Sequence, residues 1–549
     1  MEKRFWRATG VTLRHRAAAA AGACLLAASA LASATVLGAT SAGASPSGRR
    51  ATAASDTMTV LEGAGYAGDW NSGLDPGVKT GVGVANATLL DAVYGQLFDL
   101  GAHNRLVPDL ATGYRLTGGA RVLTISLRHG VRFSDGTPFD ASAVAFNFRR
   151  DLSVPVNASV LSWPKVTSIT TDGSSTVTVR FATPDGAAVT QMLDNSVSWI
   201  ASPTALQKLG EQRFKFFPVG AGPFKVVSDT PAVKLVLQKN PNYWQPGHPY
   251  LKGLTFQTVS SDESALEDLQ SHNAQAYEYM TTPQLVSGFR SAGLTVTADP
   301  GPEAIDVQLN AGVAPFNNLT ARKALYYATD SAAIDQKLFD GSCPLTQSFT
   351  GPGGLFYEPK VPGYPAYDPA KARALVRQLH GLSFTLWYFP GSPQGGQNEA
   401  VALQTMYDAV GMHVKLGSAA NIIALVDEYD THKWQAVASS SIGSYDPAGG
   451  IGVAFRLAST GPFTGIASPT VDHYITEGAQ SVGTAARAAA YAGLAHYLGQ
   501  QAYTPFICAP QTWDIAAKGV SGPGLTTATG GFGEGPLVRW QDVSFRPPA

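Results

Sequence analysis

Alternating apolar and polar positions predict several β-strands in the first half of the chain. The segments 120–128 ("ARVLTISLR"), 175–182 ("STVTVRFA") and 233–240 ("VKLVLQKN") place apolar side chains at about every second residue. This spacing lines one face of a strand. The segment 58–63 ("MTVLEG") begins in the same way and predicts the first strand of the fold.

Apolar residues spaced three to four apart predict helices between and after these strands. Leu89, Val93 and Leu97 share one face of a helix that Asn86 is placed to cap. Residues 319–339 read as two helices or one bent helix. In the second half strands and helices alternate, which predicts α/β layers, whereas the first half is richer in strands.

The stretch Leu127–Arg150, "LRHGVRFSDGTPFDASAVAFNFRR", reads as strand, turn, short strand, turn and capped helix. Its Asp-Gly turn favours a positive φ at Gly136. Asp140 is placed at the start of the helix, where an acid accepts free backbone N–H groups and suits the helix dipole. We therefore predict that this stretch is part of the framework of the fold and not a working site.

Length and composition bound the architecture. The chain has 549 residues, which predicts more than one folding unit. Its 44% hydrophobic residues allow a large core, and with only 14% charged residues the surface relies on small polar side chains. After the N-terminal region there is no apolar run of the ~18 residues that a membrane helix needs, so we expect the remainder to be soluble.

Residues 1–44 have the pattern of an export signal. The segment begins with five basic residues and one acidic residue, a long run of small and apolar residues follows, and Ala-Gly-Ala precedes Ser45. Residues 45–55 read as a linker. An uncleaved anchor and lipid attachment at Cys24 are the alternatives to simple cleavage. Without this segment the formal net charge changes from −1 to −5, and a mildly acidic chain gives no support for nucleic-acid binding.

Cysteine and histidine usage limits the chemistry. Cys343 and Cys508 remain after cleavage, and outside the cytoplasm an even count permits one disulfide. We predict that bond over the alternative of two buried thiols. The ten histidines show no metal-ligand spacing. No Walker loop, Rossmann fingerprint or nucleophile elbow is present. Neither a metal, a cofactor nor a catalytic residue is therefore predicted.

Four segments in order resemble landmarks of the family 5 extracellular solute-binding proteins, the peptide- and nickel-type receptors of ABC importers. They are "LVPDLATGYRL" with the stretch just described, "VGAGPFKVV" with "LVLQKNPNYW", "LNAGVAPFNNLTARKALYYATDSAAIDQKLFDG", and "ASPTVDHYITEGAQ". The resemblance implies an α/β fold of two lobes, like the type II, cluster C periplasmic binding proteins, with an extra subdomain in lobe I. Lobe I would comprise residues 56–300 and lobe II residues 301–502, and residues 503–549 would return to lobe I.

The same resemblance implies a receptor that is not an enzyme. It would be exported to the extracellular or periplasmic side of the membrane and act as a monomer. It would capture a peptide, above all an oligopeptide, or a similar polar solute between two closing lobes. Its partners would be ABC permease subunits and their ATPase. Two other classes stay open: an exported hydrolase that uses the same cleft, and a sensor or surface adhesin.

The charges with which dipeptide-type relatives hold both ends of a peptide are absent at the matching positions. Gly443 stands where the acid for the amine is expected, and the segment 386–400 ("LWYFPGSPQGGQNEA") contains no Lys or Arg for the carboxylate. His432 is the only histidine near the first of these loops, which disfavours nickel. What remains favours an uncharged, aromatic and hydroxyl-rich cleft for a longer peptide or a neutral solute.

Aromatic, hydroxyl and amide side chains in these loops are the candidate ligand-binding residues. Tyr277 reads either as a cleft wall or as core, and Asp446 either binds a cation or only shapes a turn. The full set is Trp70, Asn71, Tyr277, Trp387, Tyr388, Ser440, Ser441, Tyr445 and Asp446.

Overall fold

The computed structural model describes one compact unit within residues 52–549. The predictions for residues 1–55, for Asn71, for Ser441 and for Gly443 lie outside the described residues. Within the described part of the chain, no helix has both the length and the apolar character needed to cross a bilayer. The described residues are 56–63, 70, 72–78, 87–101, 105–153, 165–194, 196–390, 396–420, 422–440, 444–449, 466, 468–528, 531–532, 535–536 and 538–547.

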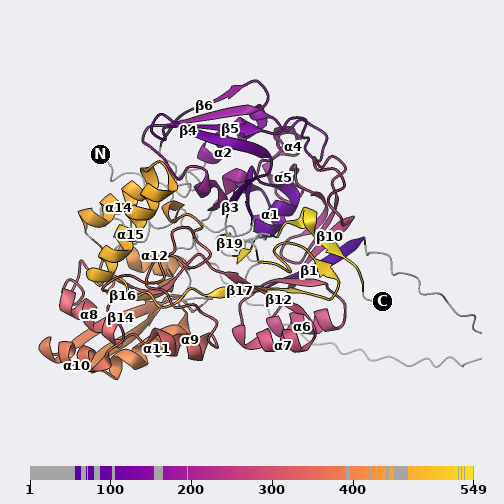
Figure 1. Cartoon of the computed structure of the whole chain (residues 1–549). Helices are drawn as coiled ribbons and strands as arrows, with labels where there is room; N and C mark the ends of the chain where they lie inside the picture. The colour runs from indigo at the N-terminus through magenta and orange to yellow at the C-terminus, as the bar shows by residue number, and fades with distance from the viewer. Residues whose placement is uncertain are drawn as a thin grey trace, which may run out of the picture. The chain divides into compact units, whose positions relative to one another are not determined.

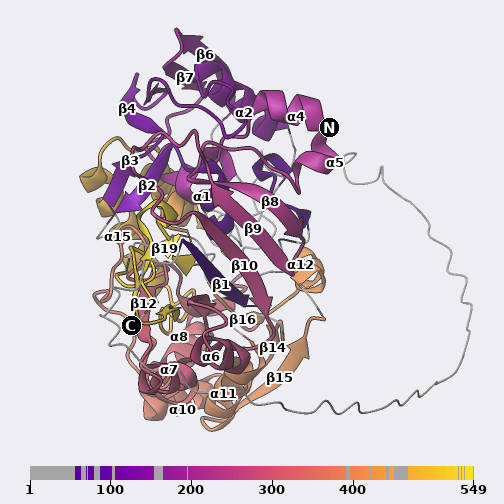
Figure 2. The ribbon, with the colours of Figure 1, turned by 90° about the vertical axis from the view of Figure 1, so that its right-hand side faces the viewer.

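A seven-stranded mixed sheet is the centre of lobe I. Its middle strand β1 (Thr57–Gly63) pairs in parallel with β10 (Gly253–Val259) and with β11 (Ala276–Met280). Figure 2 shows β8, β9, β10 and β1 side by side. In order, the sheet consists of β12 (Thr295–Pro300), β17 (Gln511–Ala516), β11, β1, β10, β9 (Lys234–Lys239) and β8 (Phe224–Thr230).

Helices and loops bury both faces of this sheet. On one face, Tyr277 and Ile515 belong to a core cluster that includes residues of α6 (Asp262–Gln270) and α7 (Val286–Ser291). On the other face lies a larger core that includes the residues of α1 (Ala87–Tyr94). The central strands β1, β11 and β17 are therefore largely buried on both sides, as expected for a sheet with parallel pairs.

A smaller antiparallel sheet forms the extra subdomain of lobe I. It supports α2 (Ala141–Ser153), whose Asp140 accepts a hydrogen bond from the backbone N of Ala143 at 3.0 Å, so the predicted cap is confirmed. Gly136 has φ 86°, as its turn predicts. The sheet order is β4 (Ala111–Thr117), β5 (Val122–Leu127), β7 (Thr176–Phe181) and β6 (Val166–Asp172), with α4 (Pro203–Leu209) and α5 (Glu211–Phe214) nearby in the sequence.

A four-stranded sheet is the centre of lobe II. The residues predicted to form a helix pair fold as α8 (Leu319–Ala328) and α9 (Ser331–Leu338), and Asp330 caps the second helix. The strand order is β13 (Ile305–Leu309), β16 (Ala436–Ser440), β14 (Leu382–Tyr388) and β15 (Met412–Ser418). Within the described residues, the other helices of lobe II are α10 (Pro369–Gln378), α11 (Gln397–Asp408), α12 (Ile422–Asp430), α14 (Pro469–Gln480) and α15 (Thr484–Gln500).

Short elements complete the described fold. They are the strand pairs β2 (Phe98–Gly101) with β3 (Arg105–Pro108), β18 (Val520–Ser521) with β21 (Ser544–Phe545), and β19 (Gly531–Phe532) with β20 (Gly535–Pro536), and the 3-10 turns at 76–78, 190–194, 196–198, 283–285 and 540–542.

The chain passes between the two large sheets twice, and the two passages are neighbours. The first runs from β12 to β13, and the second brings the chain back into β17, which lies beside β12 in Figure 1. Before that return, Cys508 accepts a backbone hydrogen bond from Ile305 at 2.8 Å and is bonded through sulfur to Cys343. Residues 505–508 therefore run along β13. The predicted boundaries at 300/301 and 502/503 stay predictions.

Candidate functional site

The edges where the parallel strands end are the places where this fold can hold a ligand. In open α/β sheets ligands bind outside the carboxyl ends of the strands. In lobe I this edge is formed by β1, β10 and β11, and in lobe II by β14, β15 and β16. Two groups of residues near these edges, a set of buried carboxyl groups and a surface around Trp387, and a third group that forms a contact between the lobes are considered as parts of the candidate site.

Four carboxyl groups from four neighbouring strands form the first group, called the carboxyl array. Glu62 on β1 lies opposite Glu278 on β11. Asp514 on β17 accepts a hydrogen bond from the backbone N of Tyr279 at 3.2 Å. Asp299 on β12 completes the array through a side-chain hydrogen bond to Asp514. All four side chains are buried.

Burial raises the pKa of every carboxyl group in this array, because the charged form loses its solvation. The charges of neighbouring acids raise the pKa values of Glu62, Glu278 and Asp299 further, whereas the hydrogen bonds from Glu278 to Glu62 and from Asp299 to Asp514 lower the pKa values of Glu62 and Asp514. Thr88, at the start of α1, donates a hydrogen bond to Glu278 at 3.3 Å. The four carboxyl groups of the array therefore bind protons more tightly than exposed carboxyl groups do.

The second group lies at the edge of the lobe II sheet. Trp387 on β14 is half-buried, and its ring lies against Gly417 on β15, where a Cβ would come within 2.6 Å of the ring. Tyr388 follows it and is 8% exposed. Ser440 ends β16 and is half-buried opposite Ile305. Trp387 and Ser440 therefore lie near the ends of adjacent strands, whereas Tyr388 belongs to the hydrophobic core of lobe II.

The third group is a contact between lobe II and the lobe I subdomain. Arg487, in the first turn of α15, donates to both carboxylate oxygens of Asp446 at 2.5 and 2.7 Å. Thr190 of lobe I donates its hydroxyl to the same carboxylate. Tyr445, the preceding residue, is 1% exposed and belongs to the hydrophobic core of lobe I. The carboxylate of Asp446 is thus held by an arginine of its own lobe.

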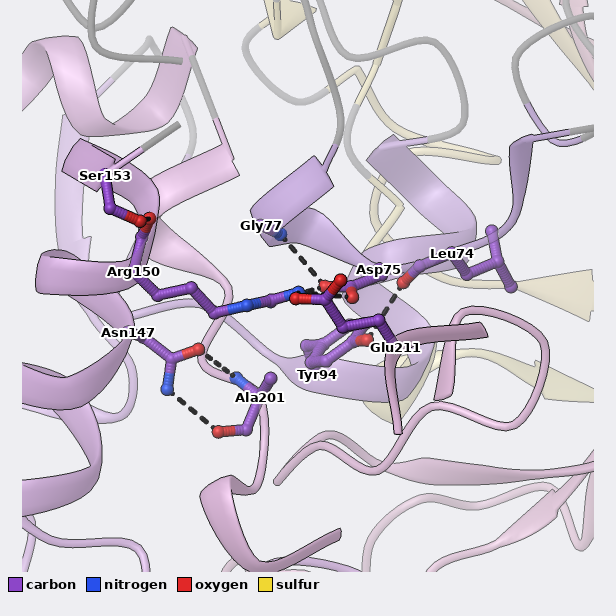
Figure 3. A network of polar contacts seen from close by, with 9 residues as sticks. All are labelled: Leu74, Asp75, Gly77, Tyr94, Asn147, Arg150, Ser153, Ala201 and Glu211. Atoms are coloured by element: carbon purple, nitrogen blue, oxygen red, sulfur yellow. Dashed lines mark hydrogen bonds and ion pairs between the residues drawn. The ribbon is translucent and has the colours of Figure 1, made fainter. Parts of the chain in front are cut away.

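A buried ion pair fixes the loop that follows β1. Arg150, at the end of α2, donates to both oxygens of Asp75 at 2.7 Å, and Asp75 also accepts the backbone N–H of Gly77 (Figure 3). Tyr94 donates to the carbonyl of Leu74 in the same network. This network joins the stretch 127–150 to the loop that carries Trp70, as expected of a framework segment.

The remaining predicted site residues lie apart from these edges. Trp70 is fully buried in the core of lobe I, and its Nε1 donates to Asp229 at 2.9 Å. Tyr277 lies in the core on the α6 and α7 side of the sheet and donates its hydroxyl to Asp262. Tyr277 is thus packed as a core residue, and of the two interpretations that the sequence allows, cleft wall or core, the structure favours the core.

The sequence interpretation missed the carboxyl array and Arg487. A signal for the array was present, because Glu62 directly follows the apolar pair Val60-Leu61 and Asp514 stands between the apolar residues Trp513 and Ile515. An acid on a buried face of a strand is uncommon unless it is paired. For Arg487 there was no local signal, since 41 residues separate it from Asp446. Within the described residues, no group of three His, Cys, Asp or Glu side chains is arranged to hold a metal ion.

Comparison with known proteins identifies the family. The model of the bacterial extracellular solute-binding proteins, family 5, matches residues 105–460. The glutathione-binding protein GsiB of Escherichia coli K12 is 30% identical over 313 residues, which cover 55% of this chain and 60% of GsiB. The chain therefore matches less than two thirds of the length of that relative.

Solved structures share the fold at low sequence identity. HbpA2 from Haemophilus parasuis has a TM-score of 0.75 at 18% identity, covering 89% of this chain and 100% of HbpA2. Haemophilus influenzae OppA in complex with the peptide RPPGFSPFR has a TM-score of 0.66 at 18% identity, covering 90% of this chain and 100% of OppA. These likenesses confirm the predicted two-lobe α/β fold. The chain belongs to the bacterial extracellular solute-binding proteins of family 5.

Proposed function

We propose that this chain is the substrate-binding receptor of an ABC importer and that it captures an oligopeptide, or a similarly polar solute, between its two lobes. The family match over residues 105–460 is the observation that carries this proposal. The two neighbouring segments that connect the lobes, β12 to β13 and the return into β17, support this proposal, because they can act as a hinge about which the lobes rotate. Export to the outer side of the membrane, and an ABC permease with its ATPase as partners, belong to the same proposal.

The edge of lobe II favours recognition along a peptide rather than at its charged ends. Trp387 supplies aromatic surface, and Ser440 supplies a hydroxyl group, at the ends of neighbouring strands. Asp446, the acid of the following loop, has its carboxylate engaged by Arg487 and Thr190. A ligand amine would have to displace that ion pair, and a buried charge-assisted contact is worth about 1.5–3 kcal/mol.

Thermal unfolding of the full secreted chain with three ligand panels tests the proposal. The panels are peptides of two to eight residues, neutral sugars, and Ni²⁺ with chelators. A ligand at about 100 times its Kd adds about 2.7 kcal/mol to the free energy of unfolding. We expect a shift with the longer peptides, and N-terminally acetylated peptides should shift the melt as much as free ones. A shift with sugars or Ni²⁺ alone would overturn the peptide assignment, and turnover of any bound solute would overturn the receptor assignment.

A further inference from the structure

The contact between the subdomain of lobe I and lobe II is built from complementary parts on both sides. On lobe I it consists of the segment 186–190, which follows the antiparallel sheet. On lobe II it consists of Tyr445 and Asp446, the end of α14, and Arg487 on α15. We call this contact the latch. It joins parts of the chain that are 256 residues apart, at Thr190 and Asp446.

On the lobe II side of the latch, contacts within lobe II orient the polar atoms. Besides its two bonds to Asp446, Arg487 donates through Nε to the carbonyl of Gly478 at 2.7 Å. Its guanidinium lies 5.1 Å from the ring centroid of Phe356. Arg487 and Asp446 are 5% and 0% exposed. Lobe II therefore holds a neutralised, oriented carboxylate, to which lobe I adds the hydroxyl of Thr190.

The lobe I side approaches so closely that only glycine fits. The backbone N of Gly186 donates to the carbonyl of Ala479 at 2.8 Å. A Cβ at Gly186 would lie 1.8 Å from the carbonyl oxygen of Ser481. Because both groups that would collide are backbone or Cβ atoms, no rotamer change can relieve the clash, and any larger residue would push the lobes apart.

An apolar anchor accompanies the polar contacts. Within the described residues, Tyr445 is the one fully buried hydrophobic residue of lobe II that belongs to the main core of lobe I. Its carbonyl accepts a hydrogen bond from the backbone N of Leu355 at 2.7 Å, and Leu355 also packs against that core. Burial of this aromatic ring in the other lobe lowers the free energy of the arrangement in which the two lobes are in contact.

From this geometry we propose that the latch closes lobe II onto lobe I in the absence of ligand and so sets how tightly any solute is held. The chain is then mostly closed before it binds, and ligand affinity depends on the latch through the fraction of closed molecules. For a protein whose competent state has population f, the apparent Kd equals the intrinsic Kd divided by f. The residues of the latch act as positioning residues for closure, whichever solute the protein takes.

Two substitutions weaken the latch by different means. Thr190→Val removes the hydroxyl that meets Asp446 and keeps the shape of the side chain. Gly186→Ala introduces the Cβ that meets Ser481. Two controls lie in the same subdomain: Thr112→Val removes an exposed hydroxyl whose partner is the carbonyl of Ser126, and Gly113→Ala adds a Cβ with no atom within 4 Å.

Small-angle scattering and amide hydrogen exchange on the ligand-free full chain test the proposal. We expect both latch variants to have a larger radius of gyration than the wild type, and the amide of Gly186 to exchange at least about tenfold faster in Thr190→Val, the effect of losing one hydrogen bond to a charged group. Both controls should match the wild type. Should Gly186→Ala fail to be secreted, Thr190→Val still carries the test.

Two results would overturn the proposal. One is a wild-type ligand-free scattering curve that fits only separated lobes. The other is equal scattering and equal Gly186 exchange in the wild type and in Thr190→Val. Neither measurement uses a peptide, so a failure of the peptide assignment leaves this test intact, and a failure of the latch leaves the peptide assignment open to its own panel.

Discussion

Pro300 lies directly opposite Gln511, and these are the last residue of β12 and the first residue of β17. Both passages between the lobes therefore leave the lobe I sheet at the same point. Beside this pair, a Cβ on Gly301 would come within 2.5 Å of the carbonyl oxygen of Pro510. The two chain segments that connect the lobes are therefore in close contact, and together they define a single hinge line about which rigid lobes can rotate.

The first prediction concerns the loop that packs on this hinge. Gly353 donates a backbone hydrogen bond to Gly301 at 3.1 Å, and a Cβ on Gly353 would lie 2.0 Å from the carbonyl oxygen of Pro300. We expect Gly353→Ala to destabilise the protein by about 1–3 kcal/mol, the usual cost of overpacking. Urea unfolding measures the change. Gly288→Ala, where the nearest side chain is 3.7 Å away, is the matched control and should not destabilise.

The second prediction concerns the disulfide next to the hinge. Cys508 lies two residues before Pro510, and its bond to Cys343 closes a loop across 165 residues. Because a cross-link restricts the unfolded chain, its loss should cost about 2–4 kcal/mol. Urea unfolding with and without a reductant should show this difference in the wild type. The double variant Cys343→Ala with Cys508→Ala should not respond to the reductant, and a wild type that also fails to respond would contradict the prediction.

Local features of the fold were predictable from the sequence, whereas long-range pairings were not. The cap at Asp140, the positive φ of Gly136 and the strands at 122–127 and 176–181 each depend on residues within a few positions of one another. The members of the carboxyl array are spread along the sequence from Glu62 to Asp514, and the local pattern of apolar residues does not indicate which acids lie together in the fold. For the same reason the burial of Trp70, a candidate ligand-binding residue, was recognised only in three dimensions, and Tyr277 had been open to interpretation as either a cleft wall or core.

The third prediction concerns the framework pair of Figure 3. Asp75 and Arg150 have side chains that are 0% and 11% exposed. Removing one partner leaves an uncompensated buried charge, so Arg150→Met should cost about 3–5 kcal/mol. The exposed pair between Lys252 and Asp56 is the control, since Lys252→Met should cost less than about 1 kcal/mol. Equal unfolding midpoints for the two variants would show that Arg150 does not support the framework.

The fourth prediction concerns the pH dependence of stability. Burial raises the pKa of Asp151 to about 8 and that of Asp109 to about 7. Because the folded state holds these protons more tightly than the unfolded chain, their contribution to stability is complete below the ordinary carboxyl pKa of about 4. It is lost as the pH rises through 7 to 8. The carboxyl array adds to the same trend, since burial raises the pKa values of its members as well.

We therefore expect the free energy of unfolding to fall between pH 5 and pH 8.5, by up to about 1.4 kcal/mol per pH unit for each titrating group. Asp151→Asn keeps the shape of the side chain and removes one titration, so its slope with pH should be shallower. Asp172→Asn, at an exposed acid, should keep the wild-type slope. A wild-type stability that rises across this range would show that these acids are ionised in the folded protein.

The last prediction concerns Trp387 and rests on the proposed function. Its ring lies over Gly417, which has no side chain to displace it, and it remains half-buried at the edge of lobe II. If this indole contacts the ligand, Trp387→Ala should weaken the binding of the peptide that gives the largest thermal shift by roughly tenfold, equivalent to about 1.4 kcal/mol. Gly417→Val should weaken it as well, because the added side chain moves the ring without removing it. Tyr367→Ala, at an aromatic residue of lobe II that is 48% exposed, should bind like the wild type. Calorimetric titration separates these cases, and wild-type affinity in Trp387→Ala would mean that the peptide is held elsewhere.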